Sequence, residues 1–222
     1  MGKYFDIGYF KKKNMLRSNI TKKRSILNKI NAWDLDKKYY DGNREDGYGG
    51  FNYDGRWKEF IPKIFKRYKL KDNSKFLDLG CKKGFLLKDL NILYPDVRTY
   101  GIENHKYPIK ESKLNSKKSK IFFADYYKIP FKDKYFDFTI AFNAIYMYNL
   151  GDVIKILKEI DRVSKKSYIV VASGENDEER NLFYKWTLIG TTILLKKEWK
   201  KLFKKINFTG DYYFSSAKSL GL

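Results

Sequence analysis

The chain has 222 residues, of which 43% are hydrophobic and 18% aromatic, and this size suits one α/β domain with an N-terminal extension. No stretch approaches the roughly 18 to 20 apolar residues of a membrane span. The N-terminus has no apolar signal-peptide core, and the single cysteine, Cys81, cannot form an internal disulfide. These features predict a cytoplasmic protein without a membrane span.

The formal net charge of +21 has two interpretations. A strongly basic chain can bind nucleic acid or another polyanion. Here the excess is nearly all lysine and is distributed along the whole chain, whereas arginine, the better reader of phosphate, is scarce. A lysine-rich composition without any polyanionic partner therefore explains the charge as well.

The N-terminal quarter is weakly patterned. Residues 1–56 are predicted to form a basic extension, and residues 57–222 the main domain. The extension contains a short amphipathic helix at 22–33 and a glycine- and aromatic-rich loop at 41–57, DGNREDGYGGFNYDGRW. After this loop, apolar residues recur at helical spacing in RWKEFIPKIFKRYKL, where Pro62 is tolerable in the first turn.

From Lys75 onward, strands and helices alternate. Apolar strands are predicted at 75–80, 97–103, 120–125, 135–144 and 167–173, with helices at 84–94, 107–118 and 152–164. Continuous apolar strands between helices indicate an α/β fold with a doubly wound, mostly parallel sheet that carries helices on both faces. The ligand crevice of such a sheet lies at the carboxyl ends of its strands.

The last fifty residues are less regular. A helix is predicted to begin in ENDEERNLFYKWTL, and TTILL reads as a strand or an edge segment. A helix at 196–206 and a late strand at 209–216 follow.

Four strand ends carry residues suited to a nucleotide cofactor. The first ends in Asp78-Leu79-Gly80, followed by a turn to Gly84, and the second ends in Glu103. Glu103 follows Gly84 by roughly 20 residues, the spacing of an acid that accepts hydrogen bonds from ribose hydroxyls. The third strand ends in Asp125, and the fourth ends in FNA.

This combination resembles the class I S-adenosylmethionine-dependent methyltransferases, which have a Rossmann-like fold. LDLGCKKGFLL is similar to their motif I, GIE to motif II, and ADYYKIPFKDKYFDFTIAFNAIYMY to the stretch around the fourth strand. LKEIDRVSKKSYIVVAS is similar to the helix and fifth strand that follow, so the resemblance covers 75–173. The upstream GYGGFNYDGRW and the downstream segment also resemble a small bacterial-type subgroup, which extends the likeness to 39–214.

The resemblance implies S-adenosylmethionine as the cofactor, with S-adenosylhomocysteine as its product. Gly80 would let the backbone approach the methionine end, Asp78 would meet the ammonium group, and Glu103 would bind the ribose hydroxyls. Asp125 would accept from the adenine amino group, with the Tyr126 N–H near the ring. The predicted cofactor-binding set is Asp78, Gly80, Cys81, Gly84, Glu103, Asn104, Asp125, Tyr126 and Phe142.

Several of these residues have a purely structural alternative. Asp78 could satisfy N–H groups of the turn, and Glu103 could act as a helix N-cap. Phe142 could belong to the core, and Cys81 fits a small buried position in the turn.

Lys82 departs from the family pattern, which has a glycine there. A side chain at φ > 0 costs roughly 1 kcal/mol or more, so we expect a turn that need not be left-handed. Lys82 reaches the cofactor carboxylate, an anionic acceptor, or simply water.

The acceptor side is predicted in the loop 41–57 and in the region after the fifth strand. Tyr48, Tyr53, Arg56 and Trp57 are the candidates for a lid of stacking and anion-pairing groups. Alternatively, the loop is plainly ordered with Trp57 in the core, or Arg56 binds the cofactor carboxylate. Trp186 and Trp199 are expected to pack.

No catalytic residue and no metal site are identified. One histidine, His105, and one cysteine cannot form a metal cluster, and His105 is expected to be structural or exposed.

The leading hypothesis is methyl transfer to a small-molecule acceptor, with a sugar-like hydroxyl as one class. The alternatives are an RNA methyltransferase that uses the basic N-terminal region and a non-catalytic S-adenosylmethionine-binding protein. A nicotinamide-dependent oxidoreductase would need G-x-G-x-x-G, which the turn from Gly80 to Gly84 does not contain.

Overall fold

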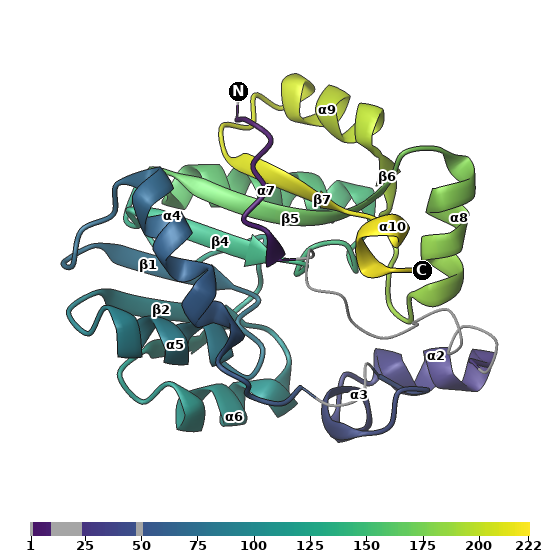
Figure 1. The fold of residues 1–222 in the computed structure, drawn as a ribbon, viewed down its shortest axis with the longest axis horizontal. Coiled ribbons are helices and arrows are strands. Elements are labelled where there is room, and N and C mark those ends of the chain that lie inside the picture. Colours follow the sequence, from purple (N-terminus) through teal and green to yellow (C-terminus); the bar gives the residue numbers. More distant parts are fainter. Residues whose placement is uncertain (1, 10–23, 48–50) are drawn as a thin grey trace.

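The computed structural model describes residues 2–9, 24–47 and 51–222, and its centre is a seven-stranded sheet (Figure 1). The strand order is β3-β2-β1-β4-β5-β6, and β7 also pairs with β5. The strands are β1 (Lys75–Leu79), β2 (Arg98–Glu103), β3 (Lys120–Phe123), β4 (Phe138–Phe142), β5 (Ser167–Gly174), β6 (Leu194–Leu195) and β7 (Asp211–Ser215). Every pairing between these strands is parallel, which confirms the predicted doubly wound sheet.

Helices cover both faces of the sheet (Figure 1). The main-domain helices are α4 (Ile61–Tyr68), α5 (Phe85–Leu93), α6 (Lys106–Asn115), α7 (Leu150–Val163), α8 (Asp177–Trp186), α9 (Lys196–Lys205) and α10 (Ala217–Leu220), with a 3₁₀ turn, η2 (Arg56–Glu59), before α4. Apolar side chains of α4 and α5 pack on one face. Those of α7 and α9 pack on the other face. None of the described helices is long and apolar enough to cross a membrane.

Helix α7 illustrates how the sequence specifies these elements. The side chain of Asn149 caps its first turn by accepting from the Asp152 N–H at 3.0 Å. Its buried residues recur every three or four positions, as expected for one face of a helix. They are Val153, Ile156, Leu157, Ile160 and Val163.

Two predicted elements differ in detail. The fourth strand begins at Phe138 rather than at 135, because Phe136 makes only an isolated bridge to Ser164. The helix predicted at 84–94 is α5, whose buried apolar residues are Leu86, Leu87 and Leu90, whereas Leu93, its last residue, is exposed.

The N-terminal residues join the edge of the sheet. Phe5 N–H donates to the Tyr212 carbonyl at 2.9 Å, and Tyr212 N–H donates to the Lys3 carbonyl at 3.1 Å. Tyr4 therefore forms an isolated parallel bridge beside β7, which no pattern in the sequence predicted.

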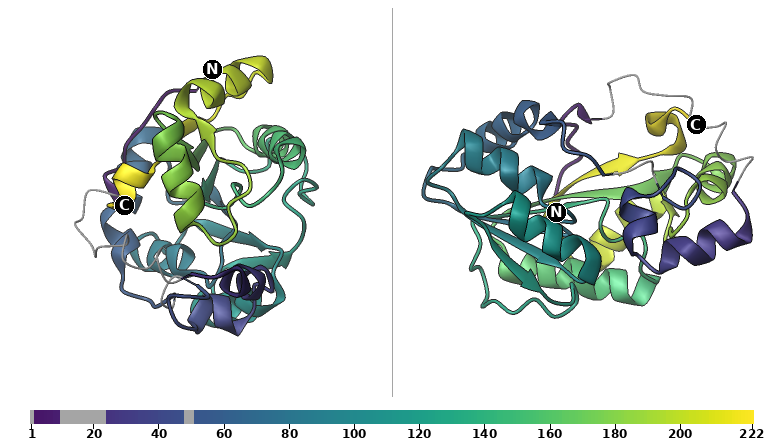
Figure 2. Two further views of the ribbon diagram at one scale, coloured as in Figure 1. Left: turned by 90° about the vertical axis from the view of Figure 1, so that its right-hand side faces the viewer. Right: turned by 90° about the horizontal axis from the view of Figure 1, so that it is seen from below.

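A small helical unit lies beside the carboxyl ends of the strands. It contains α2 (Ile26–Trp33) and α3 (Lys37–Asp41), and we call residues 24–47 the cap. The views in Figure 2 show the cap on one side of this edge, with α8 on another side. The two units frame the place where the parallel topology predicts a ligand.

Candidate active site

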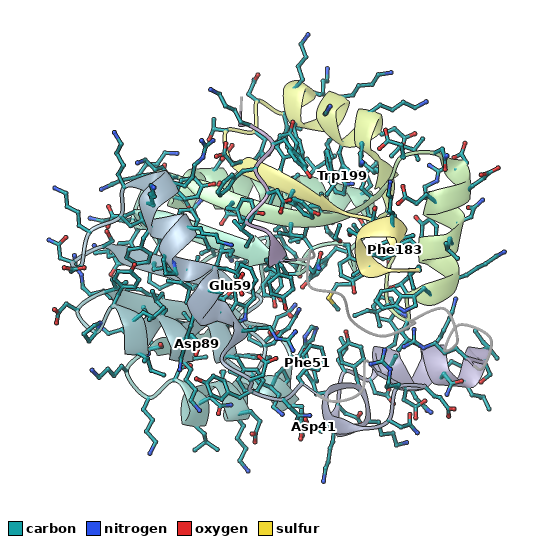
Figure 3. The ribbon with its side chains drawn as sticks, in the orientation of Figure 1. Asp41, Phe51, Glu59, Asp89, Phe183 and Trp199 are labelled. Atoms are coloured by element: carbon teal, nitrogen blue, oxygen red, sulfur yellow. The ribbon has the colours of Figure 1, made fainter. Side chains whose placement is uncertain are left out.

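A cavity of about 160 Å³ opens at the carboxyl ends of β1, β2 and β4. Its floor comes from the strand ends and includes Gly80, Lys82, Glu103, Tyr126, Asn143 and Ala144. Its walls come from the cap, from Phe51, from α8 and from the segment after β4, and include Tyr39, Tyr40, Tyr146, Phe183 and Trp186. Figure 3 places Phe51 and Phe183 on opposite sides of this region. The site is therefore polar at the bottom and aromatic at the sides.

The turn after β1 requires its two glycines. Gly80 has φ +78°, and a Cβ there would lie 2.4 Å from the Cβ of Ala144. Gly84 has φ +77°, and a Cβ there would lie 2.8 Å from the Ser116 hydroxyl. Glycine tolerates both the conformation and the contact. The first glycine lets the turn approach the end of β4, and the second lets α5 begin against α6.

Lys82 occupies the middle of this turn with φ +50°, so the expectation that the turn need not be left-handed is wrong. The strain, of the order of 1 kcal/mol, is tolerated at a site where the side chain lines the cavity. Leu35 and Asn143, two further non-glycine residues with positive φ, also line it. Backbone strain of this kind concentrates at functional sites.

The side chain of Lys82 is partly buried and lies with Nζ 5.7 Å from the centre of the Phe51 ring. Burial lowers the pKa of this amine, and the negative charges of Glu103 and Asp78 oppose that effect. The Lys82 side chain thus lines the cavity beside two acidic groups and is not directed to bulk water.

Glu103 is 1% exposed and accepts hydrogen bonds at both carboxylate oxygens. Oε2 accepts from the Lys82 N–H at 2.8 Å. Oε1 accepts from the N–H groups of Asn104 and His105 at 2.9 and 3.1 Å, and from the Tyr126 hydroxyl at 3.0 Å. Burial alone would raise the pKa of Glu103, but these bonds and the nearby His105 ring lower it below its usual range. The carboxylate is held ionised at the position where the resemblance predicts a ribose.

Asp78 is 4% exposed, and the described part of the chain offers it no hydrogen-bond or ion-pair partner. Burial raises its pKa to about 7, with Lys82 lowering it and Glu103 raising it further. The N–H groups of Gly80 and Cys81 donate instead to the Ile102 carbonyl, at 2.9 and 3.1 Å. The N–H groups of the turn therefore do not bind the Asp78 carboxylate. Asp78 stays a buried acid near the cavity, where it could bind a cation.

The other predicted cofactor residues lie around the cavity but are not among its described lining. Asn104 donates from Nδ2 to the Tyr148 hydroxyl at 2.5 Å, and its Oδ1 is buried without a hydrogen-bond partner among the described residues. Asp125 is exposed, Cys81 is buried behind the turn, and Phe142 packs 4.8 Å from the Trp57 ring centre. Their roles toward a cofactor stay predictions.

The candidates for the acceptor side lie elsewhere than the cavity wall. Tyr53 donates from its hydroxyl to Asp89 at 2.7 Å, and the Trp57 N–H donates to the same carboxylate at 3.1 Å. Arg56 pairs with Asp54 at 2.6 Å. The two bonds to Asp89, a residue of α5 that Figure 3 labels, fasten the loop to this helix, whereas the Arg56–Asp54 pair lies within the loop. Tyr48 lies outside the described residues.

Part of the wall over the cavity is the cap, of which the sequence predicted the helix at 22–33, observed as α2, but not α3. The Tyr40 hydroxyl lies 3.3 Å from His105 Nδ1, and this nitrogen lies 2.9 Å from Glu103 Oε1. Asp41 accepts from Lys83 Nζ at 2.6 Å and from the Tyr107 hydroxyl at 2.7 Å. The cap therefore docks on residues next to the turn and next to Glu103, and His105 is a link between them.

The signals for the cap were local and weak. Asp36 caps α3 through its carboxylate, which accepts from the Lys38 N–H at 2.7 Å, and Tyr39 and Tyr40 are both buried. A helix of five residues has no periodicity to detect. Trp186, expected to pack, is 8% exposed and also lines the cavity, whereas Trp199 is fully buried.

Comparison with known proteins agrees with this geometry. A family model described as a methyltransferase domain matches residues 70–207, more than half of the chain, so the chain belongs to this family. Together with the parallel sheet and the turn after β1, this makes the protein a class I S-adenosylmethionine-dependent methyltransferase. The family and fold imply S-adenosylmethionine as the cofactor.

Individual relatives are distant. Cycloartenol-C-24-methyltransferase 1 from Oryza sativa subsp. japonica is 31% identical over 156 residues, 62% of this chain and 44% of that protein. This chain therefore spans less than half the length of that relative.

Two solved structures share the fold. A putative methyltransferase from Bacillus halodurans C-125 is similar with a TM-score of 0.55 and 18% identity, over 66% of this chain and 67% of that one. A chain of the complex between the Haloferax volcanii Trm112 methyltransferase activator and a putative methyltransferase is similar with a TM-score of 0.58 and 20% identity, over 80% of this chain and 75% of that one.

Proposed function

We propose that this protein transfers a methyl group from S-adenosylmethionine to a small-molecule acceptor that presents a ring to the aromatic walls of the cavity. The observation that carries this proposal is the arrangement of the cavity. Glu103 and Lys82 line its base, Asp78 is buried in β1 two residues before the lining residue Gly80, and aromatic side chains of the cap, of α8 and of Phe51 line its walls.

The base of the cavity suits the cofactor. Glu103 would accept from the ribose hydroxyls in place of donors it now holds on Oε1, chiefly the His105 ring and the Tyr126 hydroxyl. Asp78 would meet the ammonium group, whose charge favours the ionised carboxylate. The cofactor supplies an activated methyl group when bound. The chain supplies binding, orientation and exclusion of water.

The walls suit an acceptor with an apolar face. Binding pockets are lined mainly by apolar and aromatic groups, with few polar groups that fix orientation. Aromatic side chains stack on the C–H face of a sugar ring, which supports the sugar-like hydroxyl class. An apolar ring compound is the second candidate, because the walls are largely apolar and the relative from rice is named for methylation of cycloartenol.

Methyl transfer depends more on the alignment of the acceptor atom with the methyl group than on acid–base chemistry. The protein must hold the acceptor atom in line at roughly 3 Å, and a general base is needed when a hydroxyl loses its proton. The catalytic residues therefore stay unassigned in this proposal. The enclosure of the cavity between the cap and α8 favours a small acceptor over RNA.

The test is calorimetry followed by an acceptor screen. Purified protein is titrated with S-adenosylhomocysteine, NAD and an RNA pool. Transfer of isotopically labelled methyl groups is then followed with sugar nucleotides, apolar ring compounds and RNA. We expect S-adenosylhomocysteine binding and labelling of a ring-containing small molecule. Binding of NAD alone, or labelling of RNA alone, would overturn the proposal.

A further inference from the structure

Two neighbouring lysines in the turn after β1 are used differently. Lys83 Nζ lies 2.6 Å from Asp41 and fastens the cap. Lys82 Nζ has no carboxylate within ion-pair distance among the described residues, although it lines the cavity. Of the two, Lys82 is therefore the one whose charge is available to a ligand.

Among the described residues that line the cavity, Lys82 is the one lysine or arginine. Its surroundings are acidic. Glu103 and Asp78 are the charged groups that act on it most strongly. Glu103 is already occupied by hydrogen-bond donors, and Asp78 has no partner among the described residues. Lys82 lines the floor and Asp78 is buried close to it, and neither side chain has a salt-bridge partner among the described residues.

The position of Lys82 costs backbone strain that a glycine would avoid. The chain nonetheless places a long cationic side chain there, with its N–H bound to Glu103 at 2.8 Å. Because strained backbone concentrates at functional sites, the position of Lys82 in the cavity points to a contact with a ligand.

The amino-acid end of S-adenosylmethionine carries one ammonium and one carboxylate. We propose, resting on the function proposed above, that Lys82 binds this carboxylate while Asp78 meets the ammonium group. Lys82 is then a cofactor-positioning residue: an ammonium paired with a carboxylate through a charge-assisted hydrogen bond fixes the methionine arm and with it the direction of the reactive methyl.

The experiment compares ligands that differ only in this end. Isothermal titration measures the affinity of S-adenosylhomocysteine, decarboxylated S-adenosylmethionine and 5′-methylthioadenosine for the wild-type protein and for Lys82→Met, Lys82→Arg and Lys82→Gly. Lys69→Met is the matched control, because Lys69 has a similar φ of +52° but is exposed at the end of α4. Lys82→Gly relieves the backbone strain and keeps the test valid where Lys82→Met does not fold.

We expect Lys82→Met and Lys82→Gly to weaken S-adenosylhomocysteine binding at least tenfold. Binding of the two ligands without a carboxylate should change less than twofold. Lys82→Arg should keep most of the affinity, and Lys69→Met all of it. Equal losses for all three ligands, or no loss for any, would overturn the assignment. If the Lys82 variants bind the cofactor as wild type does but have a raised KM for the acceptor, Lys82 contacts the acceptor. That result would also overturn the assignment to the cofactor carboxylate. Failure of the wild-type protein to bind any of the three ligands would instead refute the proposed function.

Discussion

The buried carboxylate of Asp78 makes the stability of the protein depend on pH in a predictable direction. Its pKa in the folded state is about 7, raised from an ordinary value of 3.8. As pH rises from about 4 to about 7, the unfolded chain releases this proton while the folded chain retains it. The contribution of Asp78 to stability is therefore complete below about pH 4 and is lost as pH rises through 7.

The magnitude follows from the two pKa values. Each pH unit across this interval costs roughly 1.4 kcal/mol, so the whole interval costs roughly 4 kcal/mol as an upper bound. Asp78→Asn keeps the shape of the side chain and removes the titration. The variant should therefore gain stability relative to wild type as pH rises, by at least about 2 kcal/mol between pH 4.5 and pH 8.

Urea unfolding followed by tryptophan fluorescence at constant ionic strength measures this difference across the pH range. Any constant offset from the new amide cancels, because only the change with pH is read. The matched control for loss of one carboxylate is Asp96→Asn, at an exposed position. Parallel stability curves for wild type and Asp78→Asn would refute the reasoning that Asp78 is buried without a partner.

Three further predictions concern the site. Glu103→Gln should weaken S-adenosylhomocysteine binding at least tenfold by calorimetry. Unchanged affinity would contradict the ribose role; Glu103→Ala is a poorer test, because it leaves buried donors unpaired at roughly 1–3 kcal/mol each. Gly80→Ala should lower the free energy of unfolding by at least about 2 kcal/mol, since its Cβ meets Ala144 at 2.4 Å; Ala144→Gly in the same chain should restore part of the loss, and no rescue would show that φ alone is responsible. Asp41→Asn should speed hydrogen exchange in α3 at least fivefold, because the ion pair with Lys83 is lost, while exchange in the central strands stays as in wild type. Unchanged exchange in α3 would mean that other contacts hold the cap.

The parts of the fold that were predictable are those with regular periodicity. The strands β1, β2, β4 and β5 carry continuous apolar runs, and α7 has an apolar face, so each element is specified by its own residues. Parallel topology then places Gly80 and Glu103 at one edge. The class of protein followed from the family resemblance that these residues and motifs carry.

The acceptor side was predictable only in part. The loop with Tyr53, Arg56 and Trp57 was predicted as the acceptor side because it is rich in glycine and aromatic residues. In the structure Tyr53 and Trp57 bond to Asp89, which depends on the position of α5, and Arg56 pairs with Asp54 within the loop. In the cap, α2 was predicted, whereas the five-residue α3 has no periodic pattern. The position of α3 depends on Tyr40, Asp41 and their partners far along the chain.

The sequence by itself determined the sheet, its order along the chain and the residues that end each strand, because local pattern and right-handed parallel crossovers leave few alternatives. The tertiary structure alone decided which charges have partners. Lys82 and Lys83 are adjacent and chemically identical, yet one is paired with Asp41 and the other faces the cavity. Asp78 and Glu103 end neighbouring strands, yet one has no partner among the described residues and the other is fully hydrogen-bonded. Such differences arise from contacts between segments distant in sequence, and no local pattern encodes them.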